Sequence, residues 1–509
     1  MSVVIGMDIG TSGTKALAMD PKGIVLASAL VEYPLHTPKP GWAEQDPADW
    51  KTAAFAALSS LAAQLGARAA DVKGVGLTGQ MHGSVFLDAS ASVLRNAILW
   101  CDQRTAAQCD AITEKVGAAR LIDMVCNPAL TGFTAPKILW LRENEPEVYE
   151  KVRKILLPKD YVRYLLTGEY ATDVADASGT LLFDVKNRCW HTELMSLLDI
   201  DAGFMPEAYE GTATTGRLTR EASSLTGLPS GIPVIAGGGD QAAGGIGCGI
   251  VKTGVISSTV GTSGVVFAFS DKVTLDTQGR VHTFCHSVPG KWHVMGVMLS
   301  AGGSLRWFRD ALCPAEKAVA VETGRDPYEY ITGAAATVPP GSEGLLFLPY
   351  LSGERTPHKD PFAKGAFIGL SLRHSRAHMA RAVLEGVAYG MRDSLEIVRN
   401  MGISVNEVRA SGGGARSPFW RQIQADVNQA PLVTINVDEG PAYGAALLAT
   451  VETGLYGSIE QACDATIRVV DTCTPDAGRA GVYDQWFREY QAAYKALAPG
   501  FTRCARLLE

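Results

Sequence analysis

Two short stretches combine glycines, hydroxyl groups and an acid in a pattern that suits phosphate binding. The first, MDIGTSGTK, begins at Met7 and places Asp8 just before a turn of small residues, and the second, TVGTSG, begins at Thr259. Glycine-rich turns let backbone N–H groups approach an anion, and a neighbouring carboxylate provides the hard oxygen ligand that a phosphate-bound Mg²⁺ needs. A single copy favours a tight turn capped by its acid, but two copies with similar flanks favour phosphate binding.

A second acid stands at the junction of a predicted strand and a predicted helix. Asp240 lies within GGGDQAAGG, where three glycines allow a ligand to approach the backbone closely. A carboxylate in this place could accept the proton of an attacking hydroxyl, an effect typically worth about 10²–10⁴-fold in rate. The alternative is that Asp240 only caps the helix that follows it.

Three further motifs leave alternatives open. In GQMHG, His82 could donate to a polyol oxygen or could be a solvated loop residue. LPYLSGERTPH, residues 348–358, could contribute to a site or form an internal salt-bridged loop around Glu354, Arg355 and His358. The glycine-rich loop of ASGGGARSPFWRQIQAD, residues 410–426, could pack flat against a planar base or merely allow a helix to cross a sheet closely.

Two familiar nucleotide motifs are excluded. No Gly-x-x-x-x-Gly-Lys-[Ser/Thr] sequence occurs, so the phosphate would be held by hairpins rather than by a Walker-type loop. GVGLTG, residues 74–79, matches Gly-x-Gly-x-x-Gly, but its glycines fall inside a predicted strand and no helix follows. A dinucleotide site is therefore not expected there.

The elements that must position these residues follow from local patterns. Apolar, β-branched segments at 3–9, 14–19 and 24–31 predict three antiparallel strands. A helix is expected to begin after Asp46 as N-cap, with Pro47 at its first position, and to end at Gly66. In the second half, residues 234–236 predict a short strand before a small-residue helix, and 255–260 with 265–269 predict a hairpin around the second GTSG. Because the two GTSG copies lie half a chain apart, we expect a duplicated fold core.

Length, charge and cysteine spacing limit the classes of molecule that this protein is expected to bind. A chain of 509 residues is too long for one hydrophobic core, so at least two large domains are expected. The formal charge is −7 and no long Lys or Arg run occurs, which argues against nucleic acid or an anionic membrane as partner. The ten cysteines form no Cys-x-x-Cys pair, no signal peptide opens the chain, and no apolar run is long enough to span a bilayer. These features predict a cytoplasmic protein with reduced thiols and a small-molecule partner.

Together, the motifs resemble those of the FGGY family of carbohydrate kinases. GMDIGTSGTK, GWAEQDPADW, GLTGQMHG, AILWCDQR, LLPKDYVRYLLTGE, VIAGGGDQAAGGIGCG, SSTVGTSGVVF, LPYLSGERTPH and SGGGARSPFWRQIQAD occur in the order that this family shows. The family's second signature is recognisable in GAFIGLSLRHSRAHMARAVLE, residues 365–385. The tail after about Val469 matches no motif, so its role is left open.

The resemblance implies an α/β fold of two ribonuclease-H-like (actin-like ATPase) domains with an interdomain active-site cleft. We expect residues 1–245 to form the first domain and 246–495 the second. It also implies ATP and Mg²⁺ as cofactors, a ketose as the small-molecule substrate, and a possible homodimer.

The resemblance assigns roles residue by residue. Asp8 would coordinate Mg²⁺, and Asp240 would be the catalytic base. The substrate would be contacted by Met81, His82, Trp100, Asp240 and Gln241. The nucleotide phosphates and adenosine would be held by Thr11, Ser12, Thr14, Gly261, Thr262, Gly413 and Ser417.

Within the family, GQMHG resembles the members that phosphorylate D-xylulose to D-xylulose 5-phosphate. Glycerol kinases carry Arg-Glu where this chain has Met81 and His82, which argues against glycerol. Kinases of L-ribulose, a hexulose or a sugar acid remain alternatives. A more remote one is an actin- or heat-shock-like ATPase that switches a protein partner, but such modules lack GQMHG, the Asp240 loop and LPYLSGERTPH.

Overall fold

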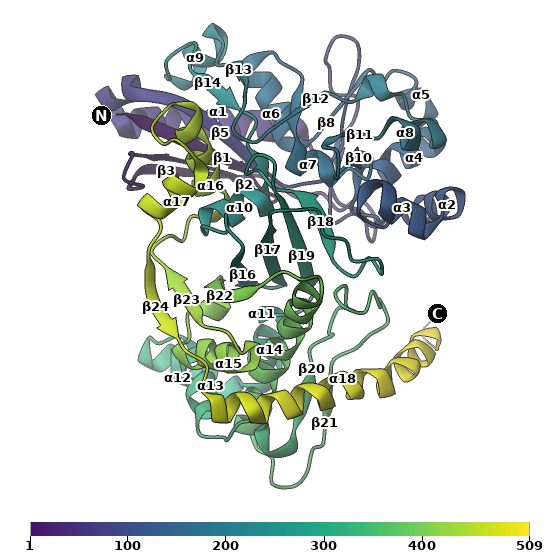
Figure 1. The fold of residues 1–509 in the computed structure, drawn as a ribbon, viewed down its shortest axis with the longest axis vertical. Helices are drawn as coiled ribbons and strands as arrows, with labels where there is room; N and C mark the ends of the chain where they lie inside the picture. Colours follow the sequence, from purple (N-terminus) through teal and green to yellow (C-terminus); the bar gives the residue numbers. More distant parts are fainter. Residues whose placement is uncertain (1, 508–509) are drawn as a thin grey trace.

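The first lobe of the molecule is built on a sheet that starts with a meander (Figure 1). The computed structural model describes residues 2–507. Three antiparallel strands are followed by two strands parallel to the first, giving the order β3-β2-β1-β5-β14. The strands are β1 (Val3–Ile9), β2 (Gly13–Met19), β3 (Val25–Glu32), β5 (Val72–Gly79) and β14 (Pro233–Ile235), with β13 (Thr214–Arg217) at the edge and β15 (Gly238–Gly239) beside the end of β5. The predicted meander is confirmed.

The second lobe repeats this arrangement. Its sheet runs β19-β17-β16-β22-β23, again three antiparallel strands followed by two parallel ones, and β18 and β24 extend the two edges. The strands are β16 (Gly254–Val260), β17 (Gly264–Ser270), β18 (His282–Cys285), β19 (Trp292–Met298), β22 (Val405–Ser411), β23 (Leu432–Ile435) and β24 (Val469–Cys473). The expected duplication of the fold core is therefore confirmed, with each GTSG turn joining the first two strands of its sheet.

Smaller elements complete the two lobes. The first contains β4 (Glu44–Gln45), β6 (Val85–Leu87), β7 (Ala97–Ile98), β8 (Lys154–Leu156), β9 (Ala171–Asp173), β10 (Phe183–Asp184), β11 (Cys189–Trp190), β12 (Glu207–Tyr209), α2 (Ala106–Val116), α3 (Ala118–Val125), α4 (Thr134–Asn144), α5 (Pro146–Tyr149), α6 (Pro158–Thr167), α7 (Val174–Ser178), α8 (Thr192–Leu197) and α9 (Arg220–Thr226). The second contains α11 (Gly302–Leu312), α12 (Pro314–Thr323), α13 (Pro327–Ala336), β20 (Leu346–Leu348), β21 (Ala366–Ile368), α14 (Arg376–Asn400), α15 (Pro418–Asn428) and α17 (Ile459–Thr466). In the described part of the chain, no helix is both long and apolar enough to cross a membrane.

Helix α1 (Pro47–Leu65) follows its sequence signals closely. The Asp46 carboxylate accepts the Ala48 N–H at the N-terminus, and Gly66 ends the helix with a φ of 56°. Its apolar face, which includes Trp50 and Leu58, is fully buried in the first core. The predicted start and end of this helix are confirmed.

Helix α16 (Gly440–Glu452) belongs to the second half of the chain but packs on the first sheet. Glycines permit this contact: a Cβ on Gly6 would lie 1.9 Å from the Ala442 carbonyl oxygen, and one on Gly76 would lie 1.9 Å from that of Ala445. Gly76 is the middle glycine of GVGLTG, which lies within β5 as expected. Gly74 and Gly76 therefore serve packing between the two halves, since a Cβ on Gly74 would lie 2.9 Å from Thr453 Cγ2.

Helix α10 (Asp240–Gly247) lies against α16 and contains the expected boundary between residues 245 and 246. The two backbones approach so closely that a Cβ on Gly444 would lie 1.8 Å from the Ala243 carbonyl oxygen. The halves of the chain are thus joined by a helix pair made of small residues.

The contact between α10 and α16 can be tested with two glycine-to-alanine variants. Gly444→Ala should destabilise the protein by about 1–3 kcal/mol, because the new methyl group overlaps a backbone that cannot retreat. Gly333→Ala, in α13, is the matched control, since its methyl group would meet nothing within 4 Å; it should be neutral or slightly stabilising. Chemical denaturation of both variants measures the difference, and equal stabilities would contradict the packing argument.

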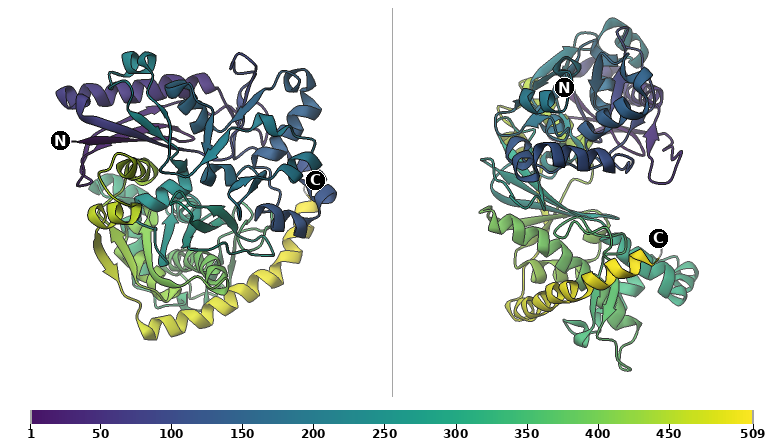
Figure 2. Two further views of the ribbon diagram at one scale, coloured as in Figure 1. Left: turned by 45° about the horizontal axis from the view of Figure 1, so that its top comes forward. Right: turned by 90° about the vertical axis from the view of Figure 1, so that its right-hand side faces the viewer.

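The tail that matched no motif forms β24 and the long helix α18 (Ala477–Arg506), which lies along the second lobe (Figure 2). Tyr483 Oη donates to Glu385 Oε1 at 2.9 Å, and Gln491 Nε2 donates to Asp393 Oδ1 at 2.7 Å, which fastens α18 to α14. The LPYLSGERTPH loop lies beneath it, where Tyr350 and Tyr490 share a hydrogen bond of 2.7 Å between their hydroxyls. The tail therefore packs against α14 and the LPYLSGERTPH loop and stabilises their positions in the second lobe.

Within residues 2–507, the glutamate of the LPYLSGERTPH loop contacts backbone N–H groups and has no salt-bridge partner. Glu354 is buried, and its Oε1 accepts the backbone N–H groups of Leu299 at 3.0 Å and Arg355 at 2.7 Å. Burial raises the pKa of Glu354 to about 8, although these N–H groups oppose the shift. The loop is thus held by hydrogen bonds to the backbone.

Candidate active site

The first GTSG turn is fixed from behind by side chains of the first lobe. Across the turn, the Gly10 N–H donates to the Gly13 carbonyl at 3.0 Å. Gln45 Nε2 donates to the Thr11 carbonyl at 2.7 Å, and both Gln80 Nε2 and Tyr33 Oη donate to the Gly10 carbonyl, at 3.3 and 2.6 Å. These backbone oxygens are thereby turned toward the protein.

The hydroxyls of this turn have three different surroundings. Thr11 Oγ1 accepts the Trp100 indole N–H at 2.9 Å and donates to Gln80 Oε1 at 3.3 Å. Thr14 is buried and its Oγ1 is 3.5 Å from Tyr33 Oη, whereas Ser12 is exposed. Trp100, which was expected to contact the substrate, is therefore hydrogen-bonded to the first GTSG turn.

Gln45 gives a test of this support. If the first GTSG turn holds nucleotide phosphate, as the resemblance implies, Gln45→Leu should raise the KM for ATP several-fold with little change in the KM for sugar, because the turn loses its main-chain anchor. Trp50 Nε1 and Gln80 Nε2, which now donate to Gln45 Oε1, would also lose their acceptor; such losses typically cost about 1–3 kcal/mol each. Trp100→Phe, which loses the bond to the Thr11 hydroxyl but keeps the main-chain anchor, should raise the KM for ATP less. Equal rises in both KM values for Gln45→Leu would contradict the assignment.

The second GTSG turn is held by the start of α11. The Gly302 N–H donates to the Gly261 carbonyl at 2.8 Å, and the Ala301 N–H donates to the Thr262 carbonyl at 2.9 Å. Arg306 Nη2 donates to Thr262 Oγ1 at 2.9 Å. A Cβ on Gly302 would lie 2.4 Å from the Gly261 oxygen, so a glycine is required at this contact.

The two predicted acids are both partly buried and lie close enough to interact. Burial raises the pKa of Asp8 to about 7, with a further rise from the Asp240 charge and an opposing effect of Lys15. Burial raises the pKa of Asp240 to about 6, opposed by hydrogen bonds from Gln241. Asp240 is not the N-cap of α10: Gly239 holds that position and no side chain caps the helix. Its carboxylate is therefore available for other chemistry.

The residues around Asp8 fit a hydrated Mg²⁺. Asp8 Oδ1 is buried and has no hydrogen-bond partner among residues 2–507, as expected of an oxygen that awaits a ligand. Within the same residues no group of three or more potential ligands forms a protein-only cage. Mg²⁺ is typically held by one or two carboxylates together with water and substrate phosphates, which agrees with this sparse donor set.

Met81 and His82 lie between two glycine-lined segments. A Cβ on Gly239 would lie 2.6 Å from Met81 Cγ, and one on Gly179 would lie 2.5 Å from His82 Nδ1. His82 has a φ of 69°, and its ring stacks on Phe133 with centroids 4.7 Å apart. These contacts bring GQMHG next to the residue that precedes Asp240.

The protonation state of His82 follows from its surroundings. Burial, and then the Lys137 charge, lower the pKa of His82 to about 3, so the ring is neutral. Its Nδ1 lies 2.6 Å from the Gly179 carbonyl oxygen, which can only accept, so the proton is on Nδ1. Nε2 is then an acceptor, whereas the sequence suggested a donor to a polyol oxygen. The difference arises because the Gly179 carbonyl accepts the ring proton on Nδ1 in a hydrogen bond, and the sequence does not reveal that Gly179 lies beside His82.

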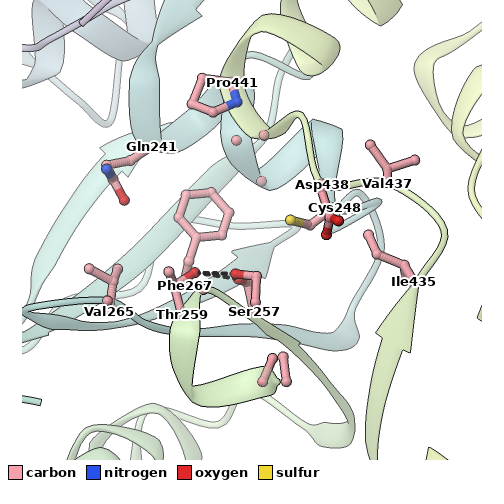
Figure 3. Close-up of a pocket in the computed structure, with 18 of the residues that line it drawn as sticks. Gln241, Cys248, Ser257, Thr259, Val265, Phe267, Ile435, Val437, Asp438 and Pro441 are labelled. Carbon is pink, nitrogen blue, oxygen red and sulfur yellow. Dashed lines mark hydrogen bonds between the residues drawn. The ribbon is translucent and has the colours of Figure 1, made fainter. Parts of the chain in front are cut away.

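A cavity of about 650 Å³ opens beside α10, between the second sheet and α16 (Figure 3). Of the predicted site residues, Asp240, Gln241, Gly261 and Gly413 line it. Ser417 instead caps α15, where its Oγ accepts the Trp420 N–H at 3.3 Å. The lining residues that the sequence analysis did not single out include Ser257, Ser411, Arg416, Ile435, Val437, Asp438 and Pro441. Asp438 and Pro441 belong to DEGP, residues 438–441, at the start of α16. The proline near the first position of that helix is a helix-start signal that the sequence could have revealed.

Comparison with known proteins agrees with this geometry. Residues 3–247 match the N-terminal domain of the FGGY family of carbohydrate kinases, and residues 256–453 match its C-terminal domain. The chain is 40% identical over 496 residues to a xylulose kinase of Escherichia coli, covering 97% of this chain and 99% of that protein. It is 39% identical over 494 residues to a xylulose kinase of Bacillus subtilis, covering 97% of each. The crystal structure of xylulose kinase from Rhodospirillum rubrum superposes with a TM-score of 0.91 at 33% identity, covering 98% of this chain and all of that one. The chain therefore belongs to the FGGY family of carbohydrate kinases.

Proposed function

We propose that this kinase transfers the γ-phosphate of ATP to the 5-hydroxyl of D-xylulose, giving D-xylulose 5-phosphate. The observation that carries the proposal is the place of Asp240, which lines a nucleotide-sized cavity while its neighbour Gly239 packs on Met81 of GQMHG. The xylulose kinases reported above support the choice of sugar.

The nucleotide is proposed to lie in the 650 Å³ cavity. Its size falls within the usual range for small-molecule sites. The loop around Gly412 and Gly413 offers a flat backbone surface to adenine, Ile435 and Val437 provide apolar cover, and Asp438 can accept a ribose hydroxyl. This direction of binding leads the phosphates toward the GTSG turns.

The transfer itself needs alignment and charge neutralisation more than covalent chemistry. Asp240 accepts the proton of the attacking hydroxyl, and the neutral His82 accepts a hydrogen bond from another sugar hydroxyl through Nε2. Asp8 would hold Mg²⁺ directly or through water, and the ion would neutralise charge on the phosphates. Backbone N–H groups of the two turns are proposed to complete the phosphate site.

Sugar-dependent ADP release tests the proposed function. D-Xylulose should give the highest kcat/KM in a panel with L-ribulose, a hexulose, a sugar acid and glycerol. Preference for another ketose or sugar acid would move the assignment within the family. ATP hydrolysis that ignores every sugar and responds to a protein or peptide would favour the switch-type ATPase.

A further inference from the structure

Five charged side chains are buried together beneath the sugar side of the site. They come from α6, from the end of β9 and from α7, and each has a relative exposure of 0%. Their charges are formally two positive and three negative. We call this group the Lys159 cluster; it comprises Lys159, Asp160, Arg163, Asp173 and Asp176.

Lys159 is the centre of the cluster. Its Nζ is 2.6 Å from Asp160 Oδ1, 2.6 Å from Asp173 Oδ2 and 3.0 Å from Asp176 Oδ2, so each of its three protons has a carboxylate nearby. Buried ion pairs often stabilise a fold no more than well-packed apolar residues would, because desolvation offsets the attraction. Stability alone therefore does not explain why these five charges are buried together.

The first connection from the cluster leads to His82. Asp173 Oδ1 accepts the N–H groups of Ala175 and Asp176 at 2.9 and 3.0 Å and so caps α7. Gly179 follows this short helix directly, and its carbonyl binds His82 Nδ1 at 2.6 Å. The position of α7 thus sets the orientation of the imidazole.

The second connection leads to Asp240. Arg163 Nη2 donates to the Ala236 carbonyl at 2.5 Å and lies 3.3 Å from Asp160 Oδ1. Ala236 lies between β14 and β15, on the short segment that ends at Asp240. Arg163 therefore restrains the segment that carries the proposed base.

We infer that Lys159 and Arg163 are positioning residues of the sugar site, which hold His82 and Asp240 at a fixed separation from one buried cluster. The inference rests on the proposed function for the identity of the sugar, but not for the contacts. It predicts that loosening the cluster changes both sugar affinity and turnover, while the nucleotide cavity, which none of the five residues lines, is unaffected.

The charge balance of the cluster provides a control variant. Burial raises the pKa of Asp176 well above its usual value; Lys159 opposes this rise, and Asp173 and Asp160 add to it. Asp176→Asn keeps the size of the side chain, removes one charge beside Lys159 and leaves two carboxylates to balance Lys159 and Arg163. Thermal unfolding of this variant tests whether the protein still folds with one cluster charge fewer.

Two charge-balanced double variants test the inference. Lys159→Met with Asp173→Asn removes one charge of each sign and keeps a residue that can cap α7. It should fold, raise the KM for sugar and lower kcat, with at least a tenfold loss in kcat/KM for sugar and an unchanged KM for ATP. Arg163→Met with Asp160→Asn removes the link to Ala236, so it should lower kcat with a smaller change in sugar KM.

Steady-state kinetics with both substrates varied, together with thermal unfolding, separate the outcomes. Folded double variants with parental sugar KM and kcat would overturn the inference, and so would equal rises in both KM values. Failure of both pairs to fold while Asp176→Asn folds would also overturn it, because the cluster would then serve the fold itself. A parental enzyme that prefers another sugar would refute only the proposed substrate, and the same variants would be assayed on that sugar.

Discussion

Asp240→Asn is expected to lower kcat by roughly 10²–10⁴-fold while the protein stays folded and still binds sugar. The amide has nearly the same shape as the carboxylate but cannot take the proton of the attacking hydroxyl. Since Asp240 caps no helix, the substitution removes no cap bond. In this variant, calorimetry should therefore show that sugar is still bound, whereas ADP release should show the loss of turnover.

The control for Asp240→Asn is a second acid in the first turn of a helix. Asp49 lies in the first turn of α1, and Asp49→Asn removes a similar favourable interaction with the helix dipole without touching the site. Any general effect on stability should be shared by the two variants, and the loss of turnover should not. Near-normal turnover in Asp240→Asn would remove Asp240 from the role of base.

Local patterns were enough to predict the elements that bear the site. The meander, the capped α1 and the hairpin around Gly261 all depend on neighbouring residues, so periodicity and cap signals reveal them. The repeated GTSG predicted the duplicated core because its flanks also matched. Asp8 and Asp240 stood out for the same reason, as acids beside glycine-rich turns.

The supporting contacts could not be predicted because they join distant parts of the chain. Gln80 stood within a quoted motif, yet its contact with Gly10 spans 70 residues. The state of His82 depends on a carbonyl 97 residues away. The adenosine contact expected of Ser417 stays a prediction. Its cap of α15 had a local signal, because Ser417 precedes a helix that starts with proline.

The packing of α16 illustrates the same limit for the fold. Its small residues look like those of many helices, and nothing local reveals that they face Gly6 and Gly76 of the first sheet. Only the pairing of two distant small-residue surfaces explains why glycines occupy two buried strands. The strand glycines that imitate a dinucleotide motif are thus a consequence of how the halves join.

Asp8→Asn should reduce turnover by roughly 10²–10³-fold and raise the Mg²⁺ concentration needed for half-maximal rate, while sugar affinity is unchanged. The magnitude is that typical of losing one charge-stabilising group at a reacting centre. Asp8 lies on the strand before the first GTSG turn, so the loss should fall on the nucleotide side. Calorimetric titration of sugar without nucleotide provides the matched measurement.

The melting temperature of Asp8→Asn provides an independent test of the role of Asp8. A buried carboxylate oxygen without a hydrogen-bond partner opposes folding, so removing the charge of Asp8 should leave the melting temperature unchanged or higher in Mg²⁺-free buffer. Residues kept for function at a cost in stability behave in this way. A variant that melts much earlier would make Asp8 a structural residue, and an unchanged Mg²⁺ dependence would remove the metal from its role. Loss of turnover with retained stability and sugar binding, together with a raised Mg²⁺ requirement, is the combination expected of a metal ligand and not of the base Asp240.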